Sequence, residues 1–245
     1  MTYESVVDSF ILNRQDFTAK DGRAFHLLEL SYPGFQYAPG QFVMVQLQKQ
    51  GFQWSYPYMI YQKTENGFQI LATHTSSLFS VASGDSVAVW GANGKGCTLP
   101  ESALFIAEAA TLHLILPLTK ACQNPHLILI GSAEMYSTDL LPEHISYMSD
   151  ISAVTSCLAN CKDKIYMALN MTALESILNN SNECRKKEMT IFVSTRIGCG
   201  IGACKSCYLH SPDINIGIPV CCNGPYLSLT SIDFEKDRKC FATFR

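Results

Sequence analysis

Three cysteines near the C-terminus are spaced closely enough to act on one inorganic centre. They lie in the run Cys199-Gly-Ile-Gly-Ala-Cys204-Lys-Ser-Cys207, and the pair Cys221-Cys222 follows. Gly200 and Gly202 accept positive φ and leave room for backbone N–H groups to approach sulfur. A C-x4-C-x2-C run with a distant fourth cysteine is the spacing of plant-type [2Fe–2S] sites, whereas structural zinc prefers two short pairs. The sequence therefore predicts a [2Fe–2S] cluster, with structural zinc and a group of unligated thiols as the alternatives.

The segment around these cysteines resembles a known family. The matching pieces are Ser194-Thr-Arg196, Cys199-Gly-Ile-Gly-Ala-Cys204, Cys207, Val220-Cys221 and Asn223-Gly-Pro225. They resemble the C-terminal cluster segment of the electron-transfer subunit of NAD-linked dihydroorotate dehydrogenase, a small member of the ferredoxin–NADP reductase superfamily. The resemblance implies four thiolate ligands: Cys199, Cys204, Cys207 and Cys221. Spacing alone does not decide whether Cys221 or Cys222 is the fourth ligand.

The same resemblance implies an α+β multidomain fold in three consecutive parts. These are an antiparallel flavin-type β-barrel in residues 1–100, a small parallel nucleotide-binding-like α/β domain in 101–193, and a [2Fe–2S] segment in 194–245. The residue pattern agrees with this order. Short alternating runs up to Leu99 predict antiparallel strands, and from Ser102 to Phe192 strands alternate with helices, as in a parallel sheet.

Individual elements follow from the same pattern. In the first part we expect strands at 25–30, 41–47, 55–61, 67–73 and 86–90. In the second we expect strands at 104–106, 126–131, 152–155, 164–169 and 188–193, and helices at 111–121, 140–148 and 172–178. Pro117 predicts a break or kink in the first of these helices.

Four consecutive residues are candidates for contacts to a flavin ring. Tyr56, Pro57, Tyr58 and Met59 stand where the resembled family has Arg-Pro-x-Ser, the strand that holds the flavin. The arginine that would contact the pyrophosphate is absent. Tyr56 and Tyr58 remain able to stack on an isoalloxazine ring. The alternative is that these tyrosines, with Tyr61, only pack within their strand.

A glycine-rich loop follows the last barrel strand. Gly91-Ala-Asn-Gly94-Lys95-Gly96 corresponds to the family's flavin-phosphate loop. Its glycines permit a close backbone approach to phosphate, and Lys95 adds positive charge. A glycine-rich turn that only leads out of the barrel is the alternative. By resemblance the flavin is FAD, although these residues do not distinguish FAD from FMN.

Both landmarks of a nicotinamide site are altered. Ala107-Glu-Ala-Ala-Thr-Leu-His113 replaces the glycine-rich turn of the family, and Glu108 brings negative charge towards the pyrophosphate position. Ala168-Leu-Asn-Met171-Thr172 replaces the Cys-Gly-Pro turn that lies beside the nicotinamide. The sequence therefore predicts a domain that does not bind NAD in the usual manner.

Composition limits the partners. A net charge of −3 without a basic stripe argues against nucleic acid. The N-terminus lacks a signal-peptide pattern, and the longest apolar run is too short to cross a bilayer. Because the 11 cysteines do not form the even ladder of a small secreted protein, we expect a reducing, cytoplasmic setting. The six histidines share no metal-binding spacing, and each reads as an ordinary surface or core residue.

These observations predict an oxidoreductase electron-transfer subunit rather than a stand-alone enzyme, with no catalytic residue of its own. It would carry electrons between a bound flavin, the [2Fe–2S] cluster and a partner flavoprotein dehydrogenase that oxidises dihydroorotate or a similar substrate. One alternative is a non-catalytic reductase-fold scaffold that holds zinc or a structural cluster and docks a protein. Another is an NAD(P)H reductase with an altered pocket.

Overall fold

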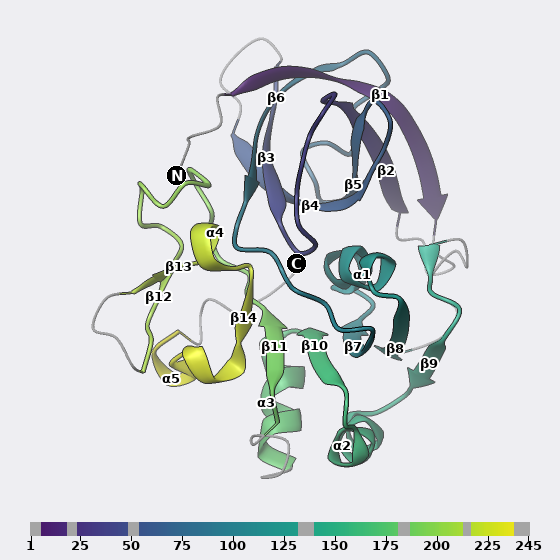
Figure 1. Cartoon of the computed structure of the whole chain (residues 1–245), viewed down its shortest axis with the longest axis vertical. Helices are drawn as coiled ribbons and strands as arrows, with labels where there is room; N and C mark the ends of the chain where they lie inside the picture. The colour runs from purple at the N-terminus through teal and green to yellow at the C-terminus, as the bar shows by residue number, and fades with distance from the viewer. Residues whose placement is uncertain are drawn as a thin grey trace.

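The computed structural model describes residues 6–18, 24–48, 54–131, 140–180, 187–212 and 217–237. Their strands form a closed barrel, a six-stranded sheet and a small two-stranded sheet. In Figure 1 the barrel lies above the six-stranded sheet, and the C-terminal segment lies beside both. The predicted fold class is therefore confirmed.

The barrel is antiparallel throughout. Its strands close in the order β1 (Val7–Thr18), β2 (Ala24–Ser31), β5 (Gly67–Thr73), β4 (Ser55–Lys63), β3 (Phe42–Leu47) and β6 (Ser86–Asn93). Apolar side chains that point inward from every strand, among them Leu28, Val43 and Ile70, fill the interior. The five strands expected in this region are all present, and β1 completes the closure.

The six-stranded sheet has a parallel body and one antiparallel edge. Its order is β14 (Tyr226–Ser228), β11 (Met189–Phe192), β10 (Lys164–Ala168), β7 (Ser102–Glu108), β8 (Asn124–Ile130) and β9 (Ile145–Met148). Only β14 runs antiparallel to its neighbour β11. The apolar residues of β7 are buried because helices cover the sheet on both faces.

Three helices pack on this sheet. They are α1 (Leu112–Ala121), α2 (Ile151–Asn160) and α3 (Met171–Asn180). Helix α1 contacts β7, β8 and β10 on one side and barrel strand β4 on the other, whereas α2 and α3 pack together away from the barrel. Pro117 lies inside α1, as expected. One apolar core runs from barrel residues such as Phe42 through α1 into the sheet, so the barrel and the sheet share a packed interface.

Two predicted elements in the middle of the chain were wrong. Residues 145–148 form strand β9, which pairs with β8, rather than the end of a helix. Pro142 explains this, because the residue before a proline is disfavoured in helical conformation. The strand expected at 152–155 is helix α2, which Asp150 caps by accepting a hydrogen bond from the Ala153 N–H at 2.9 Å.

The C-terminal segment contains β12 (Tyr208–Leu209), β13 (Ile218–Pro219), α4 (Val220–Asn223), a 3-10 turn at Leu229–Ser231 and α5 (Phe234–Asp237). Because β14 also comes from this segment, the segment is joined to the six-stranded sheet by strand pairing. Among the described residues, no helix has the length and apolar character needed to cross a membrane.

Candidate metal centre and the adjoining cavity

The four predicted cluster cysteines form two pairs. The Cys204 N–H donates to Cys199 Sγ at 3.4 Å, and the Cys221 N–H donates to Cys207 Sγ at 3.5 Å. In a [2Fe–2S] cluster each iron takes two thiolates, so two separate pairs are the donor set that such a cluster needs. Among the described residues no three cysteine, histidine or acidic side chains gather as a single metal ion would require. The residues present therefore fit the cluster, and their assignment as ligands stays a prediction.

Gly202 is required by the loop that carries these thiols. Its φ is +80°, and its N–H donates to Cys221 Sγ at 3.0 Å. A Cβ atom here would lie 2.9 Å from Cys222 Sγ, closer than side chains tolerate. An N–H that points at sulfur stabilises the thiolate, and such contacts tune the potential of a bound cluster.

The neighbouring cysteines Cys221 and Cys222 occupy different positions. Cys221 is 1% exposed and adjoins Cys207, whereas Cys222 is partly exposed with its sulfur 3.8 Å from that of Cys221. Cys221 is therefore the one that the structure pairs with Cys207. At the other pair, a hydrogen bond with the Ser206 hydroxyl lowers the pKa of the exposed Cys204 thiol to about 6.

The cysteine loop rests on the barrel. The Trp90 indole N–H donates to the Cys199 carbonyl at 2.9 Å, and the Ser55 hydroxyl lies 3.5 Å from the Gly198 carbonyl. Trp90 belongs to β6 and Ser55 opens β4. The loop is thus fixed next to the strand that contains the predicted flavin contacts.

A cavity of about 430 Å³ lies beside this loop, between the barrel, α1 and the end of β11. Its walls include Phe42, Tyr56, Pro57, Tyr58, Met59, Leu71, Thr73, Thr75, Ser76, Ser77, His113, Leu114, Phe192, Val193, Ser194, Thr195, Ile197 and Pro225. All four residues predicted to contact a flavin ring, Tyr56 to Met59, are in this lining. The volume is within the range of small-molecule sites, and the mixture of aromatic and hydroxyl groups suits a flat heterocycle.

One hydroxyl-rich turn of the lining was not anticipated. Thr73, Thr75, Ser76 and Ser77 line the cavity, and Ser76 Oγ lies 2.6 Å from the Tyr58 hydroxyl. The available signal was the density of hydroxyls in Thr73-His-Thr-Ser-Ser77, directly after a predicted strand. Such a turn offers several donors to a polar ligand.

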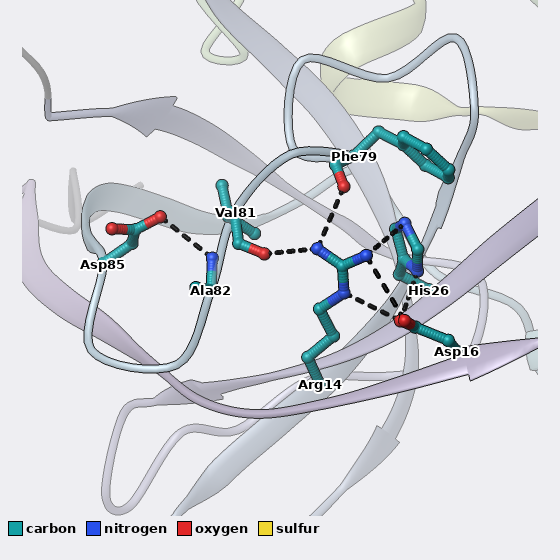
Figure 2. Close-up of polar contacts among 7 residues, drawn as sticks. All are labelled: Arg14, Asp16, His26, Phe79, Val81, Ala82 and Asp85. Atoms are coloured by element: carbon teal, nitrogen blue, oxygen red, sulfur yellow. Dashed lines mark hydrogen bonds and ion pairs between the residues drawn. The ribbon is translucent and has the colours of Figure 1, made fainter.

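A polar cluster on the barrel bonds the backbone that follows this turn (Figure 2). Arg14 Nη1 donates to the carbonyls of Phe79 and Val81 at 3.2 and 2.6 Å, and its Nε donates to Asp16 at 2.7 Å. Arg14 Nη2 lies 3.0 Å from Nε2 of His26, whose Nδ1 lies 2.6 Å from Asp16 Oδ1. Burial and the nearby Arg14 charge lower the pKa of His26, which favours the neutral ring as an acceptor for Arg14.

Replacing Arg14 by leucine is expected to lower the free energy of unfolding by about 1–3 kcal/mol, because the Phe79 and Val81 carbonyls lose their donor. Flavin retention should fall as well, since residues 75–77 lie just before these carbonyls in the chain. Urea unfolding and flavin content after gel filtration measure both effects. Arg14→Lys is the matched control. It keeps the positive charge but lacks the forked guanidinium group, so its stability and flavin retention should lie between those of the parent and the leucine variant. A leucine variant as stable as the parent would contradict this role.

His113, near the start of α1, also lines the cavity. Burial lowers its pKa from 6.5 to about 4. Between these values the unfolded chain binds a proton that the folded chain excludes. Stability should therefore fall as pH drops from about 6.5 to about 4 and be unaffected by this group at higher pH.

Melting temperature against pH checks this expectation. The slope below pH 6.5 should be shallower in His113→Leu, although His26 keeps part of it because its pKa is lowered too. An identical slope in parent and variant would mean that His113 titrates normally.

The glycine-rich loop lies elsewhere. None of Gly91, Gly94, Lys95 and Gly96 is among the described residues that line the cavity. Instead the Lys95 N–H donates to the Gly224 carbonyl at 3.2 Å, and a Cβ atom at Gly94 would lie 2.2 Å from that same oxygen. The observed close backbone approach therefore joins the barrel to the cluster segment. The contact of this loop with flavin phosphate stays a prediction.

A carboxyl group lies at the carboxyl end of the parallel strands, the edge where nucleotides usually bind to such sheets. Glu108 ends β7, and its two oxygens accept from the N–H and the side-chain amide of Asn170, each at 2.7 Å. Asn170 follows the neighbouring strand β10 and caps α3 by accepting from Ala173 N–H at 2.9 Å. Burial raises the pKa of the Glu108 carboxyl, opposed by the Asn170 N–H. Thr111 Oγ1 adds a further link across the edge to the Ala168 carbonyl.

The cluster segment matches the model of a known family. Residues 194–233 match the iron–sulfur cluster binding domain of dihydroorotate dehydrogenase B. This range contains all four predicted ligand cysteines and the last strand of the sheet. The segment is therefore similar to iron–sulfur cluster binding domains of that type.

Solved structures share the fold of the whole chain. A structure of the NADH-dependent reduced ferredoxin–NADP oxidoreductase, described for flavin-based electron bifurcation, has a TM-score of 0.76 at 13% identity and covers 100% of this chain and 96% of that one. Phthalate dioxygenase reductase has a TM-score of 0.58 at 12% identity, over 93% of this chain and 96% of its own. Ferredoxin–NADP+ reductase from Plasmodium falciparum with 2'P-AMP has a TM-score of 0.56 at 10% identity, over 78% and 98%.

At these identities the structural likeness shows the reductase fold alone. Together with the family match, it confirms the resemblance that the sequence indicated: a reductase fold that ends in a dihydroorotate dehydrogenase B-type cluster segment. The family match also supports the predicted iron–sulfur cluster.

Proposed function

We propose that this protein passes single electrons between a flavin held in the barrel cavity and a [2Fe–2S] cluster held by Cys199, Cys204, Cys207 and Cys221. The observation that carries the proposal is continuity of chain. Residues 192–195 and Ile197 line the cavity, and Cys199 follows two positions later. One short segment therefore contacts both cofactor sites, which keeps them close enough for direct electron transfer.

Each part of the chain contributes a defined task. A bound flavin supplies conversion between two-electron and one-electron chemistry, and the cluster accepts one electron at a time. Tyr58 and Met59 form the barrel wall of the cavity, while Trp90 fixes the cysteine loop through the Cys199 carbonyl. The N–H of Gly202 stabilises negative charge on Cys221 sulfur. These residues orient the cofactors and exclude water rather than transform a substrate.

We propose further that the electrons are exchanged with a protein and not with NAD. Glu108 and Asn170 bond to each other at the edge where a nucleotide pyrophosphate would approach. The cluster loop, in contrast, is open: Cys204 is exposed, and the apolar Ile201 is 41% exposed. A partner flavoprotein dehydrogenase, acting on dihydroorotate or a similar substrate, would dock over this loop.

Anaerobic reductive titration tests the proposal. Flavin takes two electrons and a [2Fe–2S] cluster takes one, so dithionite should deliver about three electron equivalents per chain. Bleaching of the flavin band should accompany a paramagnetic signal from the reduced cluster. Uptake of no electrons by protein that contains iron, or by protein that contains zinc instead, would refute electron transfer.

A non-catalytic scaffold is the second candidate, and one observation favours it. The glycine loop expected to hold the flavin phosphate contacts Gly224 and exposes Lys95 instead of lining the cavity. In that case the cluster would be structural. Zinc in place of iron, or iron that takes up no electrons, without any flavin signal, would point to this candidate.

A further inference from the structure

Strand β6 of the barrel contains one residue more than its neighbour β3 where the two strands approach the cysteine loop. Trp90 is paired with Met44 and Asn93 with Phe42, so two steps along β3 correspond to three along β6. Residues three apart on a regular strand point to opposite faces of the sheet, whereas a bulge of this kind redirects a side chain. The bulge lets Trp90 and Asn93 converge, and the Asn93 amide donates to the Trp90 carbonyl at 3.1 Å.

The two side chains converge on Gly200 of the cysteine loop. Gly200 is buried and has a φ of +78°. A Cβ atom on it would lie 2.7 Å from Met44 Cγ, 3.2 Å from Asn93 Nδ2 and 3.3 Å from Trp90 Nε1. Met44 is fully buried in the core that the barrel shares with the sheet, so it has little room to move aside. Met44, Trp90 and Asn93 therefore form a socket that fits glycine, and we call it the Gly200 socket.

The residues just before Gly200 are held to the barrel as well. The Trp90 indole N–H donates to the Cys199 carbonyl at 2.9 Å, and the Ser55 hydroxyl lies 3.5 Å from the Gly198 carbonyl. The Cys199 carbonyl belongs to the peptide group that joins Cys199 to Gly200. The Trp90 bond therefore fixes the orientation of a dipole next to a predicted cluster ligand, and such dipoles and hydrogen bonds influence the potential of an iron–sulfur cluster.

Two glycines of the glycine-rich loop leave room for the same contact between barrel and cluster segment. A Cβ atom at Gly91 would lie 2.8 Å from Nδ2 of Asn93, which belongs to the socket. A Cβ atom at Gly94 would lie 2.2 Å from the Gly224 carbonyl oxygen. Both glycines thus meet a steric requirement that comes from within the chain and involves no ligand.

We propose that Trp90 and Asn93 are positioning residues for the cluster. The bulge in β6 seats the Cys199–Gly200 peptide in the Gly200 socket, and this seat determines how firmly the cluster is held and at what potential it accepts an electron. The proposal rests on the proposed function, in which the cysteine loop holds a [2Fe–2S] cluster. It gives the bulge a task that the sequence did not predict, since the resemblance assigned its glycines to the flavin phosphate.

Trp90→Phe tests the seat, because it keeps an aromatic ring and removes the indole N–H. The loaded full chain should keep about two irons. Its cluster should have a more negative midpoint potential than in the parent, because the Cys199 carbonyl loses the donor that balances its partial negative charge. Iron release to a chelator should be about fivefold faster, as expected for the loss of one hydrogen bond. A redox titration followed by the paramagnetic signal of the reduced cluster measures the potential.

The matched control is Trp54→Phe. It makes the same replacement at the other of the two tryptophans, which is 62% exposed and lies outside the socket. Potential and iron release should equal those of the parent. Asn93→Ala, which removes the second polar group of the socket, should change both quantities in the same direction as Trp90→Phe.

Cluster-free protein provides a measurement that needs no cofactor. Lys205 is an exposed site for trypsin within the cysteine loop. Cleavage at such a site follows the fraction of molecules in which the loop is open. Trypsin should therefore cut after Lys205 about fivefold faster in Trp90→Phe than in the parent or in Trp54→Phe, which mass spectrometry of the fragments measures.

The outcomes separate this proposal from the proposed function. If the parent takes up no iron, the cluster part of the proposed function fails, and the trypsin rates alone decide whether the socket holds the loop. If Trp90→Phe melts earlier but keeps the parent's potential, iron release and trypsin rate, the bond is a general stabilising contact and the proposal is wrong. Weaker flavin binding with an unchanged cluster would also overturn it, in favour of a phosphate loop. Should Trp90→Phe not fold, Asn93→Ala decides by the same measurements.

Discussion

Replacing Cys204 by alanine is expected to remove the cluster and leave the barrel folded. Iron should fall from about two atoms per chain to near zero, because a [2Fe–2S] cluster needs all four thiolates. Cys204 is exposed and packs in no core, whereas the barrel interior is built from separate apolar residues. Iron analysis, visible absorbance and circular dichroism measure the two effects.

The matched control for this variant is Cys222→Ala. Cys222 is also near the centre, with its sulfur 3.8 Å from that of Cys221, but it does not adjoin Cys207. The alanine variant should keep the full iron content. Loss of iron in Cys222→Ala together with retention in Cys221→Ala would reverse the assignment of the fourth ligand. Retention of the cluster in Cys204→Ala would remove Cys204 from the ligand set.

NADH at millimolar concentration is expected to leave the flavin band unchanged, whereas dithionite bleaches it. At the edge of the sheet where a nucleotide pyrophosphate would approach, the Glu108 carboxyl accepts two hydrogen bonds from Asn170 at 2.7 Å each. A nucleotide would have to break both bonds and find a glycine-free turn in place of the usual phosphate loop. Anaerobic absorbance during NADH addition measures the effect.

Glu108→Gln is the informative companion to that experiment. Glutamine keeps the shape and one acceptor oxygen but removes the negative charge. Bleaching by NADH in the variant alone would identify the charge as the main barrier to the nucleotide. Bleaching of the parent by micromolar NADH would contradict the account and favour a reductase with an altered pocket.

The sequence was most informative where one physical requirement dominates. Thiol spacing with Gly202 between the thiols predicted the cluster loop, and alternation predicted each of the five expected barrel strands. It failed at 140–155, where Pro142 and the Asp150 cap override a weak apolar pattern. The type of such a short element depends on local signals such as a proline or a helix cap. The apolar pattern of the longer segment does not reveal these signals.

The cavity was harder to foresee because its walls come from distant parts of the chain. Tyr58 was found by resemblance, but His113 and Thr195 lie on α1 and after β11, and neither has a motif around it. They reach the cavity wall only in the folded arrangement. The same holds for Gly94, whose contact with Gly224 joins segments far apart in sequence.

One measurement tests the central claim most directly: an anaerobic visible spectrum of freshly purified protein, with iron, zinc and flavin assayed on the same sample. The account predicts about two irons and one flavin per chain, with absorbance from both. Zinc alone, or no metal, in protein kept free of oxygen would contradict it.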